Sequence, residues 1–167
     1  KSEYLDGEVV AMTGASENHI LVVTNLVREL SSQLMQRPCR VYSNDMRVQV
    51  SATGLYTYPD VVVVCGDRQF EDGRRDTLLN PTLIIEVFSP TTEAYDRGKK
   101  FEHYQALESL SEYVLVVQDE PRVEQFLRQD GSHWLFTATA GLDTTVTLAS
   151  IQCELAVAGI YDKVDLG

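Results

Sequence analysis

The sequence predicts an α/β protein with a mixed central β-sheet flanked by helices. Two apolar segments rich in β-branched residues, 60–65 and 82–88, have the composition of strands buried on both faces. Apolar residues recur at helical spacing in 17–36 and again in 97–107. Because the second of these helices joins strand 82–88 to a third apolar strand at 113–117, the connection is long enough to be a parallel crossover. Strands and helices in this order form a sheet covered by helices.

The N-terminal part of the chain predicts a hairpin followed by a long helix. Asp6-Gly7 lies between two short strand-like segments, and this dipeptide readily adopts the positive φ angles of a tight turn. Ser16 is a suitable N-cap for the helix that we expect over 17–36, and Pro38 prevents its continuation. The apolar stripe of this helix consists of Ile20, Val23, Val27, Leu30 and Leu34.

Shorter elements complete the predicted sheet. Segments 41–42 and 46–50 have strand character, whereas 66–80 is charged and contains Gly73, which predicts an exposed loop. Segments 122–128 and 133–138 flank Gln129-Asp130-Gly131-Ser132 and predict an antiparallel hairpin. Because the sequence has no linker, internal repeat or low-complexity tract, we expect residues 1–167 to form a single domain.

Composition and charge limit the classes of function. The chain has 44% hydrophobic and 23% charged residues, which is typical of a soluble globular protein. It contains no apolar run of the roughly 20 residues that a membrane helix needs and no secretory signal, so we expect a cytoplasmic protein that binds no membrane. The net charge of −11 argues against broad, non-specific adhesion to nucleic acid.

The three cysteines, Cys39, Cys65 and Cys153, are widely spaced and form no C-x-x-C pair. A zinc ribbon or a redox motif is therefore unsupported. We expect all three to be reduced and to act as small apolar residues in a reducing cytoplasm.

Three residues stand out as a candidate site: Asp60, Glu86 and Lys100. Glu86 lies inside the most apolar strand, where an uncompensated buried charge is very costly, so it must be protonated, paired with a cation or bound to a metal. Asp60 follows Pro59 at the start of a neighbouring strand and offers further oxygen ligands. Two such carboxylates suit Mg²⁺ or Mn²⁺. A bound ion activates water, and Lys100 on the next helix can orient that water or balance the charge of the transition state.

The same residues are also compatible with purely structural roles. Asp60 can cap a turn after Pro59, and Glu86 can form a structural ion pair with Lys100 without any metal. Lys100 follows Lys99, so both can belong to a solvated helix face. The residues alone leave these alternatives open.

Four stretches together resemble the Uma family, a bacterial family described as restriction endonucleases. They are P-D-V-V-V-V, N-P-T-L-I-I-E-V-F-S-P-T-T, D-R-G-K-K-F-E-H-Y and E-Y-V-L-V, and the resemblance extends from the first hairpin to the last. It implies the restriction-endonuclease-like fold of PD-(D/E)XK nucleases, with a mixed sheet, flanking helices and terminal hairpins.

The resemblance also implies roles for particular residues. Asp60, Glu86 and the backbone carbonyl of Val87 match the metal ligands. In the general nuclease pattern a lysine stands two residues after the glutamate, but here that residue is Phe88, and the family pattern places the lysine at Lys100 instead. Further motif positions are matched by His19, Ser89, Asp96 and Tyr104, and we expect phosphate contacts from Arg97 and Lys99.

The predicted function is Mg²⁺- or Mn²⁺-dependent hydrolysis of phosphodiester bonds by an endonuclease, with DNA as the partner. One alternative is a catalytically degenerate interaction or regulatory module, which the acidic composition and Phe88 favour. Another is a phosphohydrolase that acts on a small nucleotide. The apolar surface of the two hairpins is compatible with a homodimer, an arrangement that nuclease folds use to address both strands.

Overall fold

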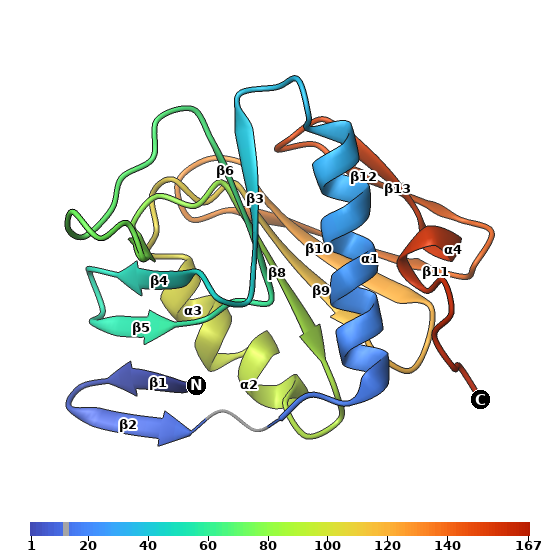
Figure 1. Ribbon diagram of the computed structural model, residues 1–167, viewed down its shortest axis with the longest axis horizontal. Helices are drawn as coiled ribbons and strands as arrows, with labels where there is room; N and C mark the ends of the chain where they lie inside the picture. Colours follow the sequence, from blue (N-terminus) through green and yellow to red (C-terminus); the bar gives the residue numbers. More distant parts are fainter. Residues whose placement is uncertain (12–13) are drawn as a thin grey trace.

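The computed structural model describes residues 1–11 and 14–167, and its centre is a large mixed sheet (Figure 1). Its β8 and β9 run parallel, with Ile85 opposite Val114, and the other neighbouring strands are antiparallel. This arrangement confirms the predicted fold class and the predicted parallel crossover. In sheet order the strands are β11 (Trp134–Ala140), β10 (Arg122–Arg128), β9 (Glu112–Val117), β8 (Leu83–Phe88), β6 (Val61–Cys65) and β3 (Cys39–Ser43).

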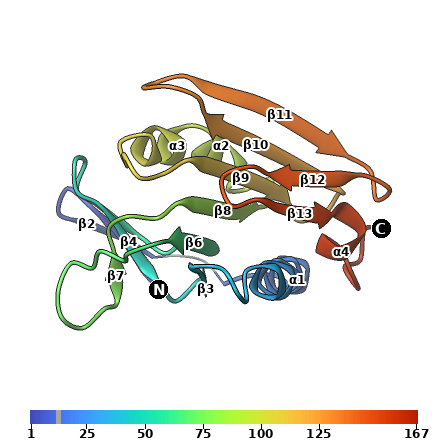
Figure 2. The same ribbon diagram turned by 90° about the horizontal axis from the view of Figure 1, so that it is seen from above.

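Both faces of the large sheet are covered (Figure 2). On one face pack α1 (Glu17–Gln33), α4 (Val157–Ile160) and a hairpin of β12 (Thr145–Leu148) and β13 (Cys153–Ala156). On the other face lie α2 (Glu93–Arg97), α3 (Lys99–Tyr104) and the smaller sheet. In sheet order the smaller sheet has β2 (Glu8–Ala11), β1 (Ser2–Leu5), β5 (Leu55–Thr57), β4 (Arg47–Val50) and β7 (Thr77–Leu78).

The side chains of β8 alternate between two hydrophobic clusters, one on each face of the large sheet. Leu83, Ile85 and Val87 belong to the cluster that packs against α1, whereas Ile84 and Phe88 belong to the cluster that packs against α3. Side chains on a strand alternate between faces, so Glu86 points to the side of α2 and α3.

The N-terminal hairpin and the start of α1 agree with prediction. Asp6 and Gly7 adopt φ angles of 51° and 86° in the turn between β1 and β2. The Ser16 hydroxyl accepts a hydrogen bond from the backbone N–H of His19 at 3.3 Å, as an N-cap does. The helix ends at Gln33, before the predicted residue 36, because the following residues form turns leading to Pro38.

The predicted helix 97–107 is wrong as a single element. It is replaced by α2 and α3, which meet at Gly98 with φ −99° and ψ −91°. A Cβ atom at Gly98 would lie 3.1 Å from the carbonyl oxygen of Ala94, so glycine allows the close approach at this break. The helical pattern also ends at Tyr104, because Gln105 and Ala106 form a turn.

The prediction of a loop over 66–80 is wrong for its last part. Thr77 and Leu78 are buried and form β7, which pairs in parallel with β4. Four further elements were not predicted from the sequence, and each is four residues long or shorter: β5, β12, β13 and α4.

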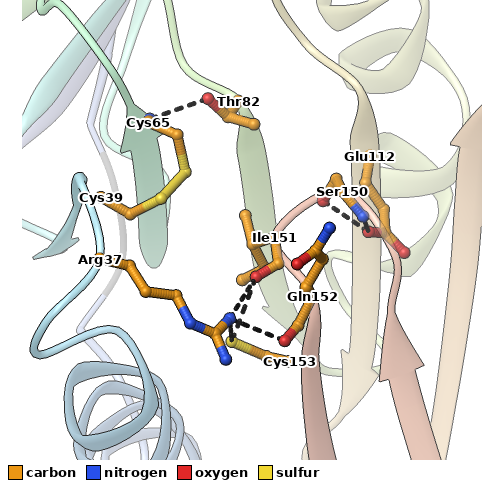
Figure 3. Close-up of a disulfide and its surroundings, with 9 residues drawn as sticks. All are labelled: Arg37, Cys39, Cys65, Thr82, Glu112, Ser150, Ile151, Gln152 and Cys153. Carbon is orange, nitrogen blue, oxygen red and sulfur yellow. Dashed lines mark hydrogen bonds between the residues drawn. A yellow bond between two sulfur atoms is a disulfide. The ribbon is translucent and has the colours of Figure 1, made fainter.

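The expectation that all three cysteines are reduced is wrong for two of them. Cys39 on β3 faces Cys65 on β6 in the antiparallel register, and the two form a disulfide (Figure 3). They are 26 residues apart in sequence, so only the register of the strands brings them together. Cys153 is a buried free thiol near Arg37, whose guanidinium donates to the carbonyl oxygens of Ile151 and Gln152.

In the part of the chain that the structure describes, no helix is long and apolar enough to cross a membrane.

Candidate functional site

Most of the predicted site residues surround one cavity of about 680 Å³. It lies where the C-terminal end of β8 meets β1, the start of α1 and the helices α2 and α3. The predicted residues in its lining are His19, Asp60, Glu86, Val87, Ser89, Asp96 and Lys100.

Glu86 is almost completely buried and is held by two side chains. Lys100 Nζ donates to its Oε2 at 3.1 Å, and the Tyr104 hydroxyl donates to its Oε1 at 3.3 Å. Burial raises the pKa of Glu86 well above its usual value; the Lys100 ammonium opposes this shift and the Asp60 carboxylate adds to it. Glu86 therefore carries its charge only at a high cost unless a further cation is present.

Asp60 lies beside Glu86 because of the register of two strands. Val61 on β6 is opposite Ile85 on β8, so the next position places Asp60 opposite Glu86. Asp60 Oδ2 accepts a hydrogen bond from the backbone N–H of Val87 at 2.7 Å. The two carboxyl groups predicted to act together are thus brought together by the sheet.

His19 reaches Asp60 from the first turn of α1. Its Nε2 lies 3.2 Å from Asp60 Oδ2. Burial opposes protonation of the imidazole, but the hydrogen bond to Asp60 and the charge of Asp60 outweigh it and raise the pKa of His19. The helix N-cap at Ser16 fixes this turn, so α1 orients Asp60 through His19.

The ammonium group of Lys100 faces three carboxyl groups in the cavity. Its Nζ lies 3.1 Å from Glu3 Oε1, 3.1 Å from Glu86 Oε2 and 3.8 Å from Asp96 Oδ1. Burial favours the neutral amine, but the Glu86 and Glu3 carboxylates outweigh it and raise the pKa of Lys100 well above its usual value. Lys100 is thus a buried ammonium and not part of a solvated helix face, unlike its exposed neighbour Lys99.

Glu3 and the two residues that hold it were not predicted from the sequence. Thr57 Oγ1 donates to Glu3 Oε1 at 2.6 Å, and the Tyr95 hydroxyl donates to Oε2 at 2.8 Å. Burial works against the charge of Glu3, but Lys100 and these donors lower its pKa overall. Alternation along β1 was the only available signal, and it does not tell which face of the first hairpin is covered.

The remaining predicted residues divide into two groups. Asp96 is buried beside Lys100, and burial raises its pKa to about 6. Ser89 lines the cavity, whereas Tyr104 lies beneath it against Glu86. Lys99 and Arg97 are absent from the described lining, and the Arg97 guanidinium instead pairs with Glu93 and Glu124.

The chemistry of these donors fits a hard divalent cation. Four buried carboxylates, those of Glu3, Asp60, Glu86 and Asp96, share the single ammonium of Lys100 and the imidazole of His19. Oxygen ligands with surplus negative charge are what Mg²⁺ and Mn²⁺ prefer. Across the described ranges no three His, Cys, Asp or Glu side chains are grouped as metal ligands. An ion would therefore be held by two carboxylates and would keep several waters, as Mg²⁺ usually does.

Comparisons with known proteins agree with this fold. A protein from Anabaena variabilis, described as a putative nuclease belonging to DUF820, has a crystal structure that superposes with a TM-score of 0.77 at 19% identity. The alignment covers 98% of this chain and 90% of that one. At this identity the likeness supports the fold alone.

Two curated relatives come from Synechocystis sp., and both are described as uncharacterized proteins. Slr1290 is 36% identical over 163 residues, which covers 96% of this chain and 83% of the relative. Sll1609 is 35% identical over 152 residues, which covers 91% of this chain and 86% of the relative. The model of the Uma2 family, described as "Putative restriction endonuclease", matches residues 1–158. Because this family model matches nearly the whole length of the chain, the chain belongs to the Uma2 family.

Proposed function

We propose that this chain is a divalent-metal-dependent endonuclease that hydrolyses phosphodiester bonds in DNA. The observation that supports it best is the meeting of Asp60 and Glu86 from adjacent strands, with Lys100 Nζ 3.1 Å from Glu86, at a solvent-connected cavity. Membership of a family described as restriction endonucleases agrees with this chemistry.

Each residue of the cavity would have a separate role in metal binding, charge stabilisation or positioning. Asp60, Glu86 and the carbonyl of Val87 would hold Mg²⁺ or Mn²⁺, which when bound activates water and polarises a phosphoryl oxygen. Lys100 presents a fixed positive charge beside Glu86, where it can donate to a phosphate oxygen as negative charge develops. His19 orients Asp60, and Tyr104 orients Glu86, so neither carboxylate has to reorganise during the reaction.

The contacts of Lys100 favour one competing candidate. Its ammonium already faces Glu3, Glu86 and Asp96, which is also the arrangement of a structural ion-pair network in a catalytically degenerate binding module. A cavity of about 680 Å³ is moreover large enough for a small nucleotide, so a nucleotide phosphohydrolase is a further candidate.

One experiment separates these candidates. The purified protein is incubated with supercoiled plasmid, linear polynucleotides or single nucleotides, each with Mg²⁺, Mn²⁺ or a chelator. We expect divalent-ion-dependent nicking of plasmid that is lost in Glu86→Gln and kept in Glu154→Gln, a matched change at an exposed position. Hydrolysis of nucleotides alone would favour the phosphohydrolase, and no hydrolysis with either ion would favour the degenerate module.

A further inference from the structure

The outer face of the smaller sheet carries three tyrosines that the proposed site does not use. Tyr4 on β1 is directly opposite Tyr56 on β5, with ring centroids 6.0 Å apart and an interplanar angle of 64°. Tyr58 follows two residues later, just past the end of β5, and lines a cavity together with Tyr4 and Tyr56. We call Tyr4, Tyr56, Tyr58 and the neighbouring Arg47 the tyrosine platform.

Tyr4 and Tyr56 lie on the opposite side of β1 and β5 from the site. Glu3 and Thr57 point inward and hydrogen bond to each other beside Lys100. Tyr4 and Tyr56 alternate with them and point outward. Tyr4 is 43% exposed, and Tyr56 and Tyr58 are partly exposed, so part of each side chain is accessible to a ligand.

The platform leads to the site around the end of β5. A second cavity of about 420 Å³ is lined by Ser2, Glu71 and all four platform residues. Tyr58 lines this cavity and also the cavity of Asp60 and Glu86. A flexible chain that lies on the tyrosines can therefore continue past Tyr58 into the site.

The chemistry of the platform matches unpaired nucleobases better than duplex. The Arg47 guanidinium lies 5.3 Å from the centroid of Tyr56, so a cation and aromatic rings are presented together. Glu71 lies 3.9 Å from Arg47 and offsets part of its charge. Duplex binding depends on neutralising many phosphates, to which a chain of net charge −11 with two cations at these rings, Arg47 over Tyr56 and Lys1 over Tyr58, is poorly suited. Stacking of unpaired bases on aromatic rings adds binding energy that does not come from neutralising phosphates.

We propose that the tyrosine platform binds unpaired bases of a DNA strand and delivers the strand to the cavity of Asp60 and Glu86. The preferred substrate is then single-stranded or locally unpaired DNA. This inference rests on the proposed nuclease function for its second half, whereas binding of the strand can be measured without it.

Cross-strand tyrosine pairs also stabilise sheets, so the test must separate binding from folding. Fluorescence anisotropy of a labelled single strand of about 12 nucleotides, within the usual range of site sizes, is measured in a chelator and compared with the same sequence as duplex. We expect the single strand to bind at least about 10-fold more tightly, and Tyr56→Ala and Tyr58→Ala to weaken it by about 5- to 100-fold each.

Matched variants make the result specific to ring stacking. Tyr56→Phe and Tyr58→Phe keep the rings and should keep most of the affinity. Phe136→Ala removes a ring that is 49% exposed on the edge strand β11 of the other sheet, and should leave the affinity unchanged. Thermal melting of each variant identifies loss of folding. Equal affinity for single strand and duplex, or alanine variants that bind like wild type, would overturn the proposal.

The two proposals fail in different ways. If the single strand binds through the tyrosines but no substrate is cleaved, the platform stands and the nuclease function fails. If plasmid is cleaved in a Glu86-dependent way but the alanine variants of the platform bind and cleave normally, the nuclease function stands and the platform fails.

Discussion

The ammonium of Lys100 lies 3.1 Å from the carboxylate of Glu86, and both side chains are almost completely buried. The pair joins the short helix α3 to the central strand β8. The charges around this pair are not balanced, because the carboxyl groups of Glu3 and Asp96 also face the same ammonium. Removing the cation and removing the anion should therefore have opposite effects on stability.

Lys100→Met should destabilise the fold strongly. It leaves Glu3, Glu86 and Asp96 buried without a counter-charge, and loss of one partner of a buried pair costs about 3–5 kcal/mol. Urea unfolding measures the loss. Lys99→Met, a matched change on the exposed neighbour, should cost less than about 0.5 kcal/mol. Equal losses in the two variants would contradict the central role of Lys100.

Glu86→Gln should keep or increase the free energy of unfolding while it abolishes metal-dependent cleavage. The amide is nearly isosteric with the carboxyl group, and the change removes a buried charge whose pKa is raised by burial. Lys100 keeps Glu3 and Asp96 as partners. Urea unfolding and plasmid nicking on the same sample test both halves, and a loss of more than about 2 kcal/mol would show that Glu86 is mainly structural.

Mn²⁺ should stabilise the wild-type protein and not the Glu86→Ala variant. An ion that binds only the native state adds about 2.7 kcal/mol to the free energy of unfolding at 100 times its Kd. Calorimetric titration and the melting temperature with and without Mn²⁺ provide the measurement, and Glu154→Ala serves as the exposed control. A melting temperature that Mn²⁺ raises equally in all three proteins would place the ion elsewhere.

The parts of the fold that could be predicted from sequence are those with a strong periodic signal. The β-branched run 61–64 and the apolar stripe of α1 are buried in the core, so the structure agrees with the elements that these patterns predict. By contrast, β7 has two residues and β5 has three, too few for any period to be detected. Their pairing is decided by distant strands, which the sequence does not reveal.

Part of the candidate site could be predicted because one of its residues interrupts a strongly apolar pattern. Glu86 is conspicuous because it interrupts an apolar strand, and its position led to Asp60 and Lys100. Glu3 gave no such signal, because it lies in a hairpin whose next residue, Tyr4, is exposed. The pairing of Arg97 with Glu124 could not be predicted, because Glu124 is 27 residues away on β10. Long-range charge pairing of this kind depends on the topology.

Reduction of the Cys39–Cys65 disulfide should lower stability without changing the fold. The bond closes a loop over a sequence separation of 26, and a loop of that size corresponds to about 3–4 kcal/mol. Urea unfolding with and without reductant gives the difference. The double variant Cys39→Ser/Cys65→Ser should be less stable than the oxidised wild type and insensitive to reductant. If reductant leaves the wild type unaffected, the bond contributes nothing.

The Arg97–Glu124 pair should give the protein a defined acid sensitivity. The hydrogen bond from Arg97 lowers the pKa of Glu124 below its usual value; burial opposes the shift, and Arg122 adds to it. A carboxyl group whose pKa is lower in the folded state stabilises the fold above its unfolded pKa, near 4.5, and this contribution disappears as the pH falls through the folded pKa.

Glu124→Gln should therefore cost about 1–2 kcal/mol at pH 7, and the difference from wild type should shrink as the pH falls below about 4.5. Urea unfolding at several pH values measures the free energy of unfolding of both proteins. Glu154→Gln, at an exposed position, should follow the wild type throughout. A difference that stays constant over this range would mean that Glu124 acts through packing alone. A difference that shrinks would establish that the charge pair, and not the shape of the side chain, ties α2 to β10.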